Sequence, residues 1–369
     1  MAACKAAGGL LLRPLRPLLR QMSSEVHFTE SPKVGLITLD RQKALNAINT
    51  SMVADITRQL ITWRSTPNVE VVCIEGAGGK AFCAGGDVVS ITKDAEHSHA
   101  AAMEFFFKEF QMNYMIGTYP TTYVALIHGI TMGGGVGLSV HGKYRVATEK
   151  SLYAMPETAI GYFPDVGGSY FLSRLPQCYG MFLGLTGHRL RGADLKHLGI
   201  ATHYTESAGL AALKEAILAS DSSSILATLD GHESQLPAPF SLQPHADLIQ
   251  HCFSADTVQE IMVRLGESGT EFAEKLLKTL SRMSPRSLVI THKLLTLAPS
   301  LSYQECFKME YAAATEVVAS GEFTEGVRAL LVDKDNAPRW NPASLAEVTE
   351  EMVEKYFTNP VRDWEPLQF

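Results

Sequence analysis

The pattern of hydrophobic and polar residues divides the first half of the chain into short blocks, and each block predicts a strand or a helix. Apolar runs at residues 34–39, 69–75 and 122–127 are typical of buried strands, because they are short and bounded by turn residues. Residues 51–62 and 101–116 repeat apolar side chains along one stripe, as in an amphipathic helix. Strands alternating with helices predict an α/β fold whose sheet is covered by helices.

The pattern changes after residue 222. Residues 231–245 contain three prolines, which predicts a linker or a surface loop. Four later segments have helical periodicity and few strand signals: 257–265, 270–283, 287–298 and 302–320. We therefore divide the chain into a core at residues 25–225 and a helical C-terminal region at residues 226–369.

The first 24 residues differ in composition from the rest. They contain Lys5, Arg13, Arg16 and Arg20, and no acidic residue precedes Glu25. This composition is typical of a mitochondrial transit peptide, although a disordered basic tail would share it. We therefore predict that residues 1–24 are a transit peptide and that the protein resides in the mitochondrial matrix. No later stretch reaches the ~18 uninterrupted apolar residues of a membrane span, so we expect no membrane partner.

The overall composition narrows the function classes. With 46% hydrophobic and 19% charged residues, the chain is typical of globular proteins. A formal net charge of -7 argues against nucleic-acid binding, which usually needs a basic face. The six cysteines lack metal-site spacing and indicate reduced thiols. The close pair His97 and His99 has no further ligand at a recognised spacing, so the sequence predicts no metal site.

Glycines gather in two segments, AFCAGGD at residues 81–87 and TMGGGVG at residues 131–137. The second lies between a predicted strand and a helix expected to reach about His141. Neither phosphate motif fits: GxGxxG spacing fails, and the P-loop-like GLSVHGK is followed by Tyr144 instead of Ser or Thr. The two segments can present backbone N–H groups to one point as an oxyanion hole, or they can merely permit tight turns.

Four segments together resemble the signature blocks of the crotonase superfamily: ALNAI at 44–48, KAFCAGGD at 80–87, IHGITMGGGVGLSV at 127–140 and YAMPETAIGYFPDVGG at 153–168. They occur in the family's order and cover about residues 34–200. The resemblance implies a crotonase-like spiral of β-β-α units that binds acyl-CoA thioesters. It also implies an oxyanion hole made by the N–H groups of Gly86 and Gly134. Ala44, Lys80 and Ala84 would lie near the nucleotide end of CoA.

The acidic residues decide which reaction the resemblance favours. Hydratases of the family place one glutamate after the triple glycine, but this chain has Gly137 there, which cannot transfer a proton. The second glutamate is kept as Glu157, and Asp165 follows in FPDVGG. With DKDNAPRWNP at residues 333–342, this combination resembles the family's hydrolases of short 3-hydroxyacyl-CoA thioesters in mitochondrial valine breakdown. Glu157 would then be base or nucleophile, and Asp165 would position Glu157, water or the substrate hydroxyl.

Several interpretations stay open at this point. Glu109 on its predicted helix would ordinarily be solvated, whereas the resemblance implies that it faces the acyl pocket. Cys83, His128 and His141 are predicted to be structural, because no pattern activates them. No separate cofactor is expected, since CoA enters as part of the substrate. An oligomer is compatible with the sequence.

Two other functions compete with hydrolysis. An enoyl-CoA hydratase or isomerase is disfavoured by the glycine at position 137. A non-catalytic scaffold or an RNA-associated protein on the same fold is disfavoured by the retained Glu157 and Asp165 and by the acidic net charge.

Overall fold

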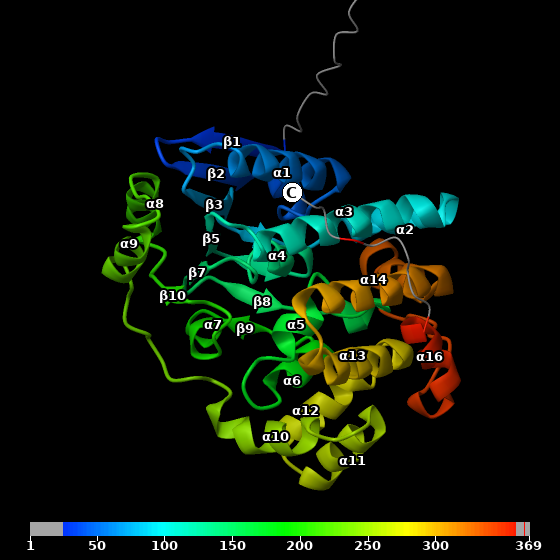
Figure 1. The fold of residues 1–369 in the computed structure, drawn as a ribbon. Helices are drawn as coiled ribbons and strands as arrows, with labels where there is room; N and C mark the ends of the chain where they lie inside the picture. Colours follow the sequence, from blue (N-terminus) through cyan, green and yellow to red (C-terminus); the bar gives the residue numbers. More distant parts are fainter. Residues whose placement is uncertain (1–24, 359–364, 366–369) are drawn as a thin grey trace, which may run out of the picture.

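The computed structural model describes residues 25–358 and residue 365, in which helices surround two neighbouring sheets (Figure 1). The larger sheet has the strand order β1-β2-β3-β5-β7-β10, and all its pairs are parallel except β1 with β2. Its strands are β1 (Val26–Glu30), β2 (Val34–Leu39), β3 (Val71–Gly76), β5 (Thr122–Ile127), β7 (Tyr144–Ala147) and β10 (His203–Tyr204). The three predicted strands are thus confirmed and lie side by side.

The smaller sheet has the order β4-β6-β8-β9, with only β9 antiparallel to its neighbour. Its strands are β4 (Ala81–Cys83), β6 (Ile130–Met132), β8 (Leu152–Ala154) and β9 (Leu190–Arg191). Three times, a strand of the larger sheet turns into a strand of the smaller one and a helical segment follows. This repeat is the predicted spiral of β-β-α units.

The helices of the core follow the predicted stripes. The first, α1 (Thr50–Arg64), begins where the Asn49 side chain accepts a hydrogen bond from the Met52 N–H. It buries Met52, Ile56 and Leu60, the stripe that the sequence predicts. The other helical segments up to residue 200 are η1 (Gln42–Ala44), α2 (Val88–His97), α3 (His99–Gly117), α4 (Gly134–Gly137), η2 (Glu157–Ile160), α5 (Gly168–Leu172), α6 (Tyr179–Thr186) and α7 (Ala193–His197).

One predicted boundary is wrong: α4 ends at Gly137 and does not reach His141. The Ser139 hydroxyl donates to the carbonyls of Gly135 and Val136, both at 3.0 Å. A hydroxyl that occupies these carbonyls competes with the backbone pattern of a continuing helix. The chain therefore turns early and leaves the glycines at the start of a very short helix.

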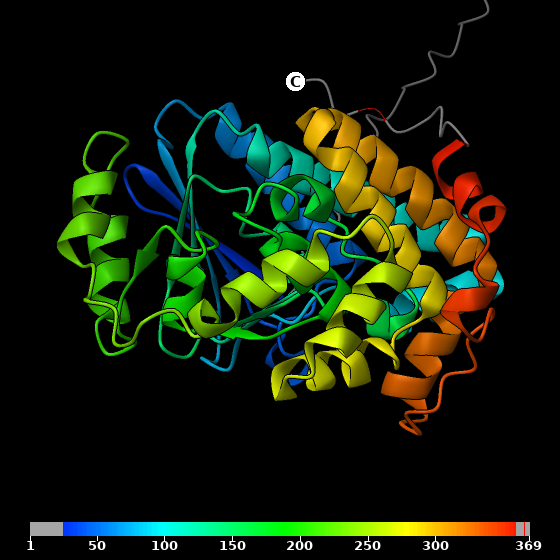
Figure 2. The same ribbon diagram turned by 90° about the horizontal axis from the view of Figure 1, so that it is seen from below.

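The larger sheet separates two apolar layers. On one face lie α8 (Leu210–Leu218) and α9 (Ile225–Gly231), which stand apart from the other helices in Figures 1 and 2. Their buried side chains pack against alternate residues of the strands, among them Val34, Val71 and Val124. The opposite face belongs to one continuous core that extends into the C-terminal helices.

The C-terminal region is helical, as predicted, after an irregular stretch at residues 232–242. Its elements are η3 (Gln243–His245), α10 (Ala246–Phe253), α11 (Val258–Ser268), α12 (Glu271–Leu280), α13 (Pro285–Leu297), η4 (Ala298–Ser300), α14 (Tyr303–Ser320), α15 (Glu322–Val327), the π-helical turn η5 (Arg328–Val332), η6 (Leu345–Glu347) and α16 (Glu350–Thr358). The division at residues 225 and 226 stays a prediction. None of the helices between residues 25 and 358 is long and apolar enough to span a bilayer.

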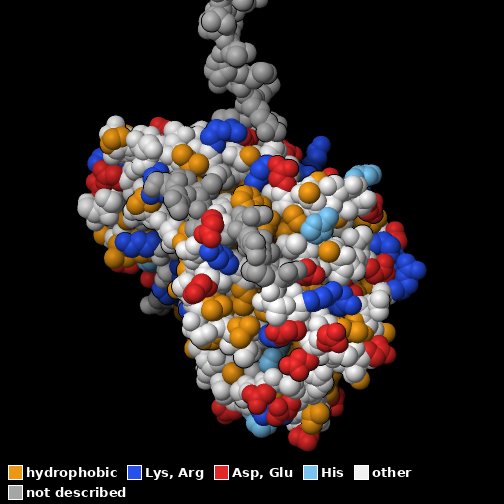
Figure 3. Space-filling view, turned by 45° about the vertical axis from the view of Figure 1, so that its right-hand side comes forward, with side chains coloured by type: hydrophobic (Ala, Val, Ile, Leu, Met, Phe, Trp, Pro, Cys, Tyr) orange, Lys and Arg blue, Asp and Glu red, His pale blue; other side chains and the backbone are white. Residues whose placement is uncertain are grey.

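On the face drawn in Figure 3, acidic and basic side chains are interspersed. Neither sign of charge forms a continuous surface over the described residues visible there. This face therefore has the mixed character of an ordinary protein surface.

Candidate active site

A pocket of about 330 Å³ lies where the first turns of the spiral meet the C-terminal region. It is lined by residues that are far apart in the sequence, including Gly86, Glu109, Gly134, Glu157 and Asp165. The four residues predicted to be catalytic therefore share one cavity with Glu109. Ala84 also lines it. Its volume falls within the range of small-molecule sites.

Two backbone amides lie close together at one end of this pocket. Gly86 pairs with Ile48 in a short bridge made by the Ile48 and Asp87 amides, so the Gly86 N–H takes no part in it. Gly134 is the first residue of α4, where helix amides have no intrahelical acceptor. A methyl group at Gly134 would lie 3.2 Å from the Gly86 nitrogen. Among the described residues neither amide has a backbone acceptor, and two neighbouring free donors are what an oxyanion hole requires.

Glu157 is the first residue of η2 and directly follows Pro156. Its side chain is buried, and its Oε2 atom has no hydrogen-bond partner among the described residues. A methyl group at Gly133 would lie 2.9 Å from its Oε1 atom, so the carboxyl group faces the triple glycine. Burial, and secondarily the charge of Asp165, raises the pKa of Glu157 well above its usual range.

Asp165 lies in the loop between η2 and α5 and is also buried. Burial is the main cause that raises the pKa of this carboxyl well above its usual range, and the charges of Glu109 and Glu310 add to it. The side chain therefore holds a proton more readily than an exposed aspartate.

Glu109 of α3 faces the pocket and not the solvent, with only 2% of its surface exposed. A methyl group at Gly134 would collide with its Oε1 atom, which has no hydrogen-bond partner in the described part of the chain. Burial, followed by the charge of Glu157, raises the pKa of Glu109 to about 8. Glu109 and Glu157 thus lie beside the triple glycine, and Asp165 lines the same pocket.

The site has no room for an acid at position 137. A methyl group at Gly137 would lie 2.7 Å from Cβ of Val166 and 2.8 Å from Nδ2 of Asn113. Real Cβ atoms do not approach other heavy atoms so closely. The side chain that family hydratases carry at this position is therefore excluded by packing as well as absent from the sequence.

Ala44 and Lys80 do not line the pocket. Ala44 ends η1 beside it, because the next residue, Leu45, accepts a hydrogen bond from the Ala84 amide at 3.1 Å. Lys80 is exposed in the turn before β4. Of the three predicted CoA neighbours only Ala84 lines the cavity, and the roles of Ala44 and Lys80 stay predictions.

The residues predicted to be structural are placed accordingly. Cys83 is fully buried, and burial raises the pKa of its thiol to about 12, so the thiolate nucleophile is disfavoured. His128 Nδ1 is hydrogen-bonded to the Thr148 hydroxyl, and His141 Nε2 donates to the Val166 carbonyl. Neither histidine lines the pocket. The cysteines among the described residues are free thiols, as expected.

Part of the pocket wall was not anticipated. Phe323 of α15 and Leu330 and Leu331 of the π-helical turn line the cavity, together with the exposed Arg189. Helical periodicity predicts that the C-terminal helices exist, but it does not say which of them reaches the acyl pocket. Leu331 lines the cavity although 43% of its surface is exposed, and nothing near it in the sequence indicates this role.

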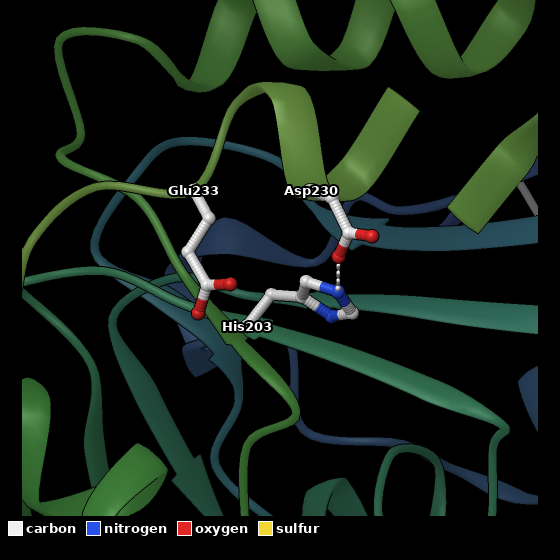
Figure 4. A group of neighbouring side chains, drawn as sticks. All are labelled: His203, Asp230 and Glu233. Atoms are coloured by element: carbon white, nitrogen blue, oxygen red, sulfur yellow. Dashed lines mark hydrogen bonds and ion pairs between the residues drawn. The ribbon is translucent and has the colours of Figure 1, made fainter. Parts of the chain in front are cut away.

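One group of potential metal ligands occurs in the described part of the chain, made by His203, Asp230 and Glu233 (Figure 4). His203 Nε2 lies 3.1 Å from Oδ1 of Asp230, and Lys196 Nζ lies 2.7 Å from Oε1 of Glu233. The lysine already pairs with the glutamate of the group. The group is remote from the pocket lining, and we interpret it as an ion-pair network.

The fold and this pocket are those of the crotonase class of enzymes, and comparison with known families supports this assignment. A family model described as enoyl-CoA hydratase/isomerase matches residues 34–357, so the chain belongs to this family. Two solved structures resemble it over nearly its whole length. A carnitinyl-CoA dehydratase from Mycobacterium thermoresistibile is 38% identical with a TM-score of 0.87, covering 93% of this chain and 98% of the other. An enoyl-CoA hydratase from Rhodobacter sphaeroides is 36% identical with a TM-score of 0.84, covering 91% and 97%.

Curated relatives narrow the comparison further. The mitochondrial 3-hydroxyisobutyryl-CoA hydrolase of Homo sapiens is 48% identical over 342 residues, which cover 91% of this chain and 89% of the relative. The corresponding protein of Danio rerio is 46% identical over 343 residues, covering 91% and 90%. The relatives' names agree with the predicted mitochondrial location, and the assignment to the matrix stays a prediction. The predicted transit peptide, residues 1–24, lies outside the described residues.

Proposed function

We propose that the protein hydrolyses the thioester of 3-hydroxyisobutyryl-CoA to the free acid and CoA, as a step of valine breakdown. The observation that carries this proposal is the composition of the pocket. Glu157 and Asp165 line the same cavity as Gly86 and Gly134, and a side chain at position 137 would collide with Val166 and Asn113. The curated relatives named as hydrolases of this thioester support the same reaction.

The amides of Gly86 and Gly134 would bind the thioester oxygen. As the carbonyl carbon becomes tetrahedral, negative charge develops on this oxygen, and two preorganised donors in a water-poor pocket stabilise it. Removal of one such donor from other enzymes slows turnover by roughly 10²–10³-fold. This interaction is independent of which group attacks the carbon.

The carboxyl groups would supply the proton transfers. Three buried acids cannot all be ionised together, because burial and mutual repulsion oppose each charge. One carboxylate, Glu157, then activates water or attacks the carbonyl itself, while the cluster still holds a proton for the departing sulfur. Both routes consume one water and release one carboxylic acid and one thiol. An acyl adduct on Glu157, detected by mass spectrometry after acid quenching, distinguishes attack from water activation.

The same chemistry leads us to propose that CoA is the bound carrier and that no separate cofactor is used. Ala84 would contact the CoA chain at the pocket edge, with Ala44 and Lys80 further toward its nucleotide end. Glu109 would contact the acyl group. A Lys80→Ala variant that raises KM without lowering kcat supports this arrangement, because a phosphate contact remote from the thioester contributes uniform binding.

The central test is release of free thiol from 3-hydroxyisobutyryl-CoA by residues 25–369. Glu157→Gln should lower kcat by about 10²–10⁴-fold, the usual contribution of a catalytic acid or base. Hydration of crotonyl-CoA should be negligible in the same preparation. Hydration without thiol release would refute the proposal and favour a hydratase.

A further inference from the structure

The loop that carries Asp165 has an uncommon backbone conformation. Val166 has a φ of 52° and Gly167 a φ of 79°, so two successive residues are left-handed. The left-handed backbone conformation is unfavourable for β-branched residues, so contacts with the surrounding structure have to hold Val166 in it. Gly167 also lacks room for a side chain, because a methyl group would lie 2.5 Å from the His141 ring.

A buried carboxylate from a distant helix binds this turn. Glu310 of α14 is 0% exposed and accepts hydrogen bonds from the amides of Gly167 and Ser169, each at 2.8 Å. The Ser169 hydroxyl donates to the same carboxylate. Three donors thus converge on one side chain that lies more than 140 residues further along the chain.

The opposite side of the turn is held by a histidine. His141 Nε2 lies 2.6 Å from the Val166 carbonyl oxygen, so the ring donates to that carbonyl. Burial lowers the pKa of His141 to about 4, which keeps the ring neutral and leaves it a fixed donor at neutral pH. The carbonyl of Val166 and the amides that follow it are therefore bound from two directions.

We propose that Glu310 is a positioning residue, whose carboxylate fixes the left-handed turn at residues 166 and 167 and thereby holds Asp165 in the acyl pocket. The inference rests on the proposed function, because it assumes that Asp165 acts on the bound acyl group. It assigns a role in the reaction to α14, which lies outside the β-β-α repeats (Figure 1).

Position 137 connects the turn to the choice of reaction. The left-handed turn places Cβ of Val166 against Gly137, where it fills the space of a second acid. The conformation that presents Asp165 thus also excludes the hydratase glutamate. Loss of the hydrogen bonds to Glu310 should therefore weaken thioester hydrolysis without creating hydratase activity.

Glu310→Gln tests the inference, because a glutamine offers one acceptor oxygen and cannot bind both amides. We expect kcat on 3-hydroxyisobutyryl-CoA to fall by about 10²-fold, the cost of a small misplacement of a catalytic group, with KM little changed. In the double variant with Asp165→Asn, the Glu310 substitution should cause no additional loss. Leu265→Ala, which opens a cavity in α11, serves as the control for destabilisation and should retain the wild-type kcat.

Hydrogen exchange gives a readout that does not depend on turnover. The amides of Gly167 and Ser169 should exchange faster in Glu310→Gln than in the wild type, while those of α11 stay unchanged. Full kcat in Glu310→Gln, losses that simply multiply with Asp165→Asn, or unchanged exchange would each overturn the inference. If the wild type releases no thiol, the proposed function fails, and the exchange result still decides whether Glu310 holds the turn.

Discussion

Replacing Gly137 by alanine tests whether packing against Val166 and Asn113 excludes a side chain from this position. The added methyl group would lie 2.7 Å from Cβ of Val166 and 2.8 Å from Nδ2 of Asn113, and both neighbours are fully buried. Overpacking of this kind costs about 1–3 kcal/mol. The usual gain from replacing a helical glycine is about 0.5–1 kcal/mol. The cost outweighs the gain over most of these ranges, so we expect a net loss of up to about 2.5 kcal/mol.

The chain offers a matched control at Gly266, in the last turn of α11, where a methyl group would meet nothing within 4 Å. Gly266→Ala should raise the free energy of unfolding by about 0.5–1 kcal/mol. Urea denaturation of both variants, followed by circular dichroism, measures the two effects with opposite expected signs. In a Val166→Gly background, where the closest contact is absent, the cost of Gly137→Ala should shrink.

The functional consequence is assayed with Gly137→Glu. If packing excludes the acid, this variant loses stability and hydrates crotonyl-CoA no faster than the wild type. Two results would refute the reasoning: a Gly137→Ala protein as stable as Gly266→Ala, or a folded Gly137→Glu protein with hydratase activity.

Three further predictions concern the acids and the buried thiol. The pKa of Glu109 is about 8 in the folded protein and near its ordinary value of 4.5 in the unfolded chain, so the stability of the wild type should fall as the pH rises between these values. Urea unfolding should show a smaller fall for Glu109→Gln. Parallel stability curves for the two proteins would contradict this prediction. Asp165→Asn should reduce kcat by about 10²–10⁴-fold in thiol-release kinetics, and an unchanged kcat would remove this residue from the reaction. Cys83→Ala should retain the wild-type kcat, because burial keeps the thiol protonated, whereas an inactive but folded variant would point to a thiol nucleophile.

The elements that sequence periodicity predicts well are those whose apolar stripe is long. The helix α1 and the strands β2 and β5 were predicted within a few residues, because each buries a regular set of side chains. Strands of three residues, such as β4 and β6, carry too short a pattern to be recognised. The end of α4 depends on the hydroxyl of Ser139, which no periodicity records.

The residues of the candidate site also fall into two groups, those that the sequence predicts and those that only the fold reveals. Glu157 and Asp165 belong to one contiguous motif, so a family resemblance could nominate them. Glu310 and Phe323 reach the site through long-range packing, and nothing near them in the sequence indicates it. The sequence left open whether Glu109 is solvated or faces the acyl pocket. Only the fold decides this, because α3 could have turned either face toward the sheet.

The two free amides belong to successive turns of the spiral. Gly86 follows β4 and Gly134 follows β6, and these strands are paired in parallel. Strand pairing therefore fixes the spacing of the donors, and no side chain takes part. Truncating the pocket's larger side chains to alanine would leave both donors in place, because the anion site is made by the main chain. For the same reason, the acids around the pocket can all be replaced while the fold keeps its oxyanion-binding site.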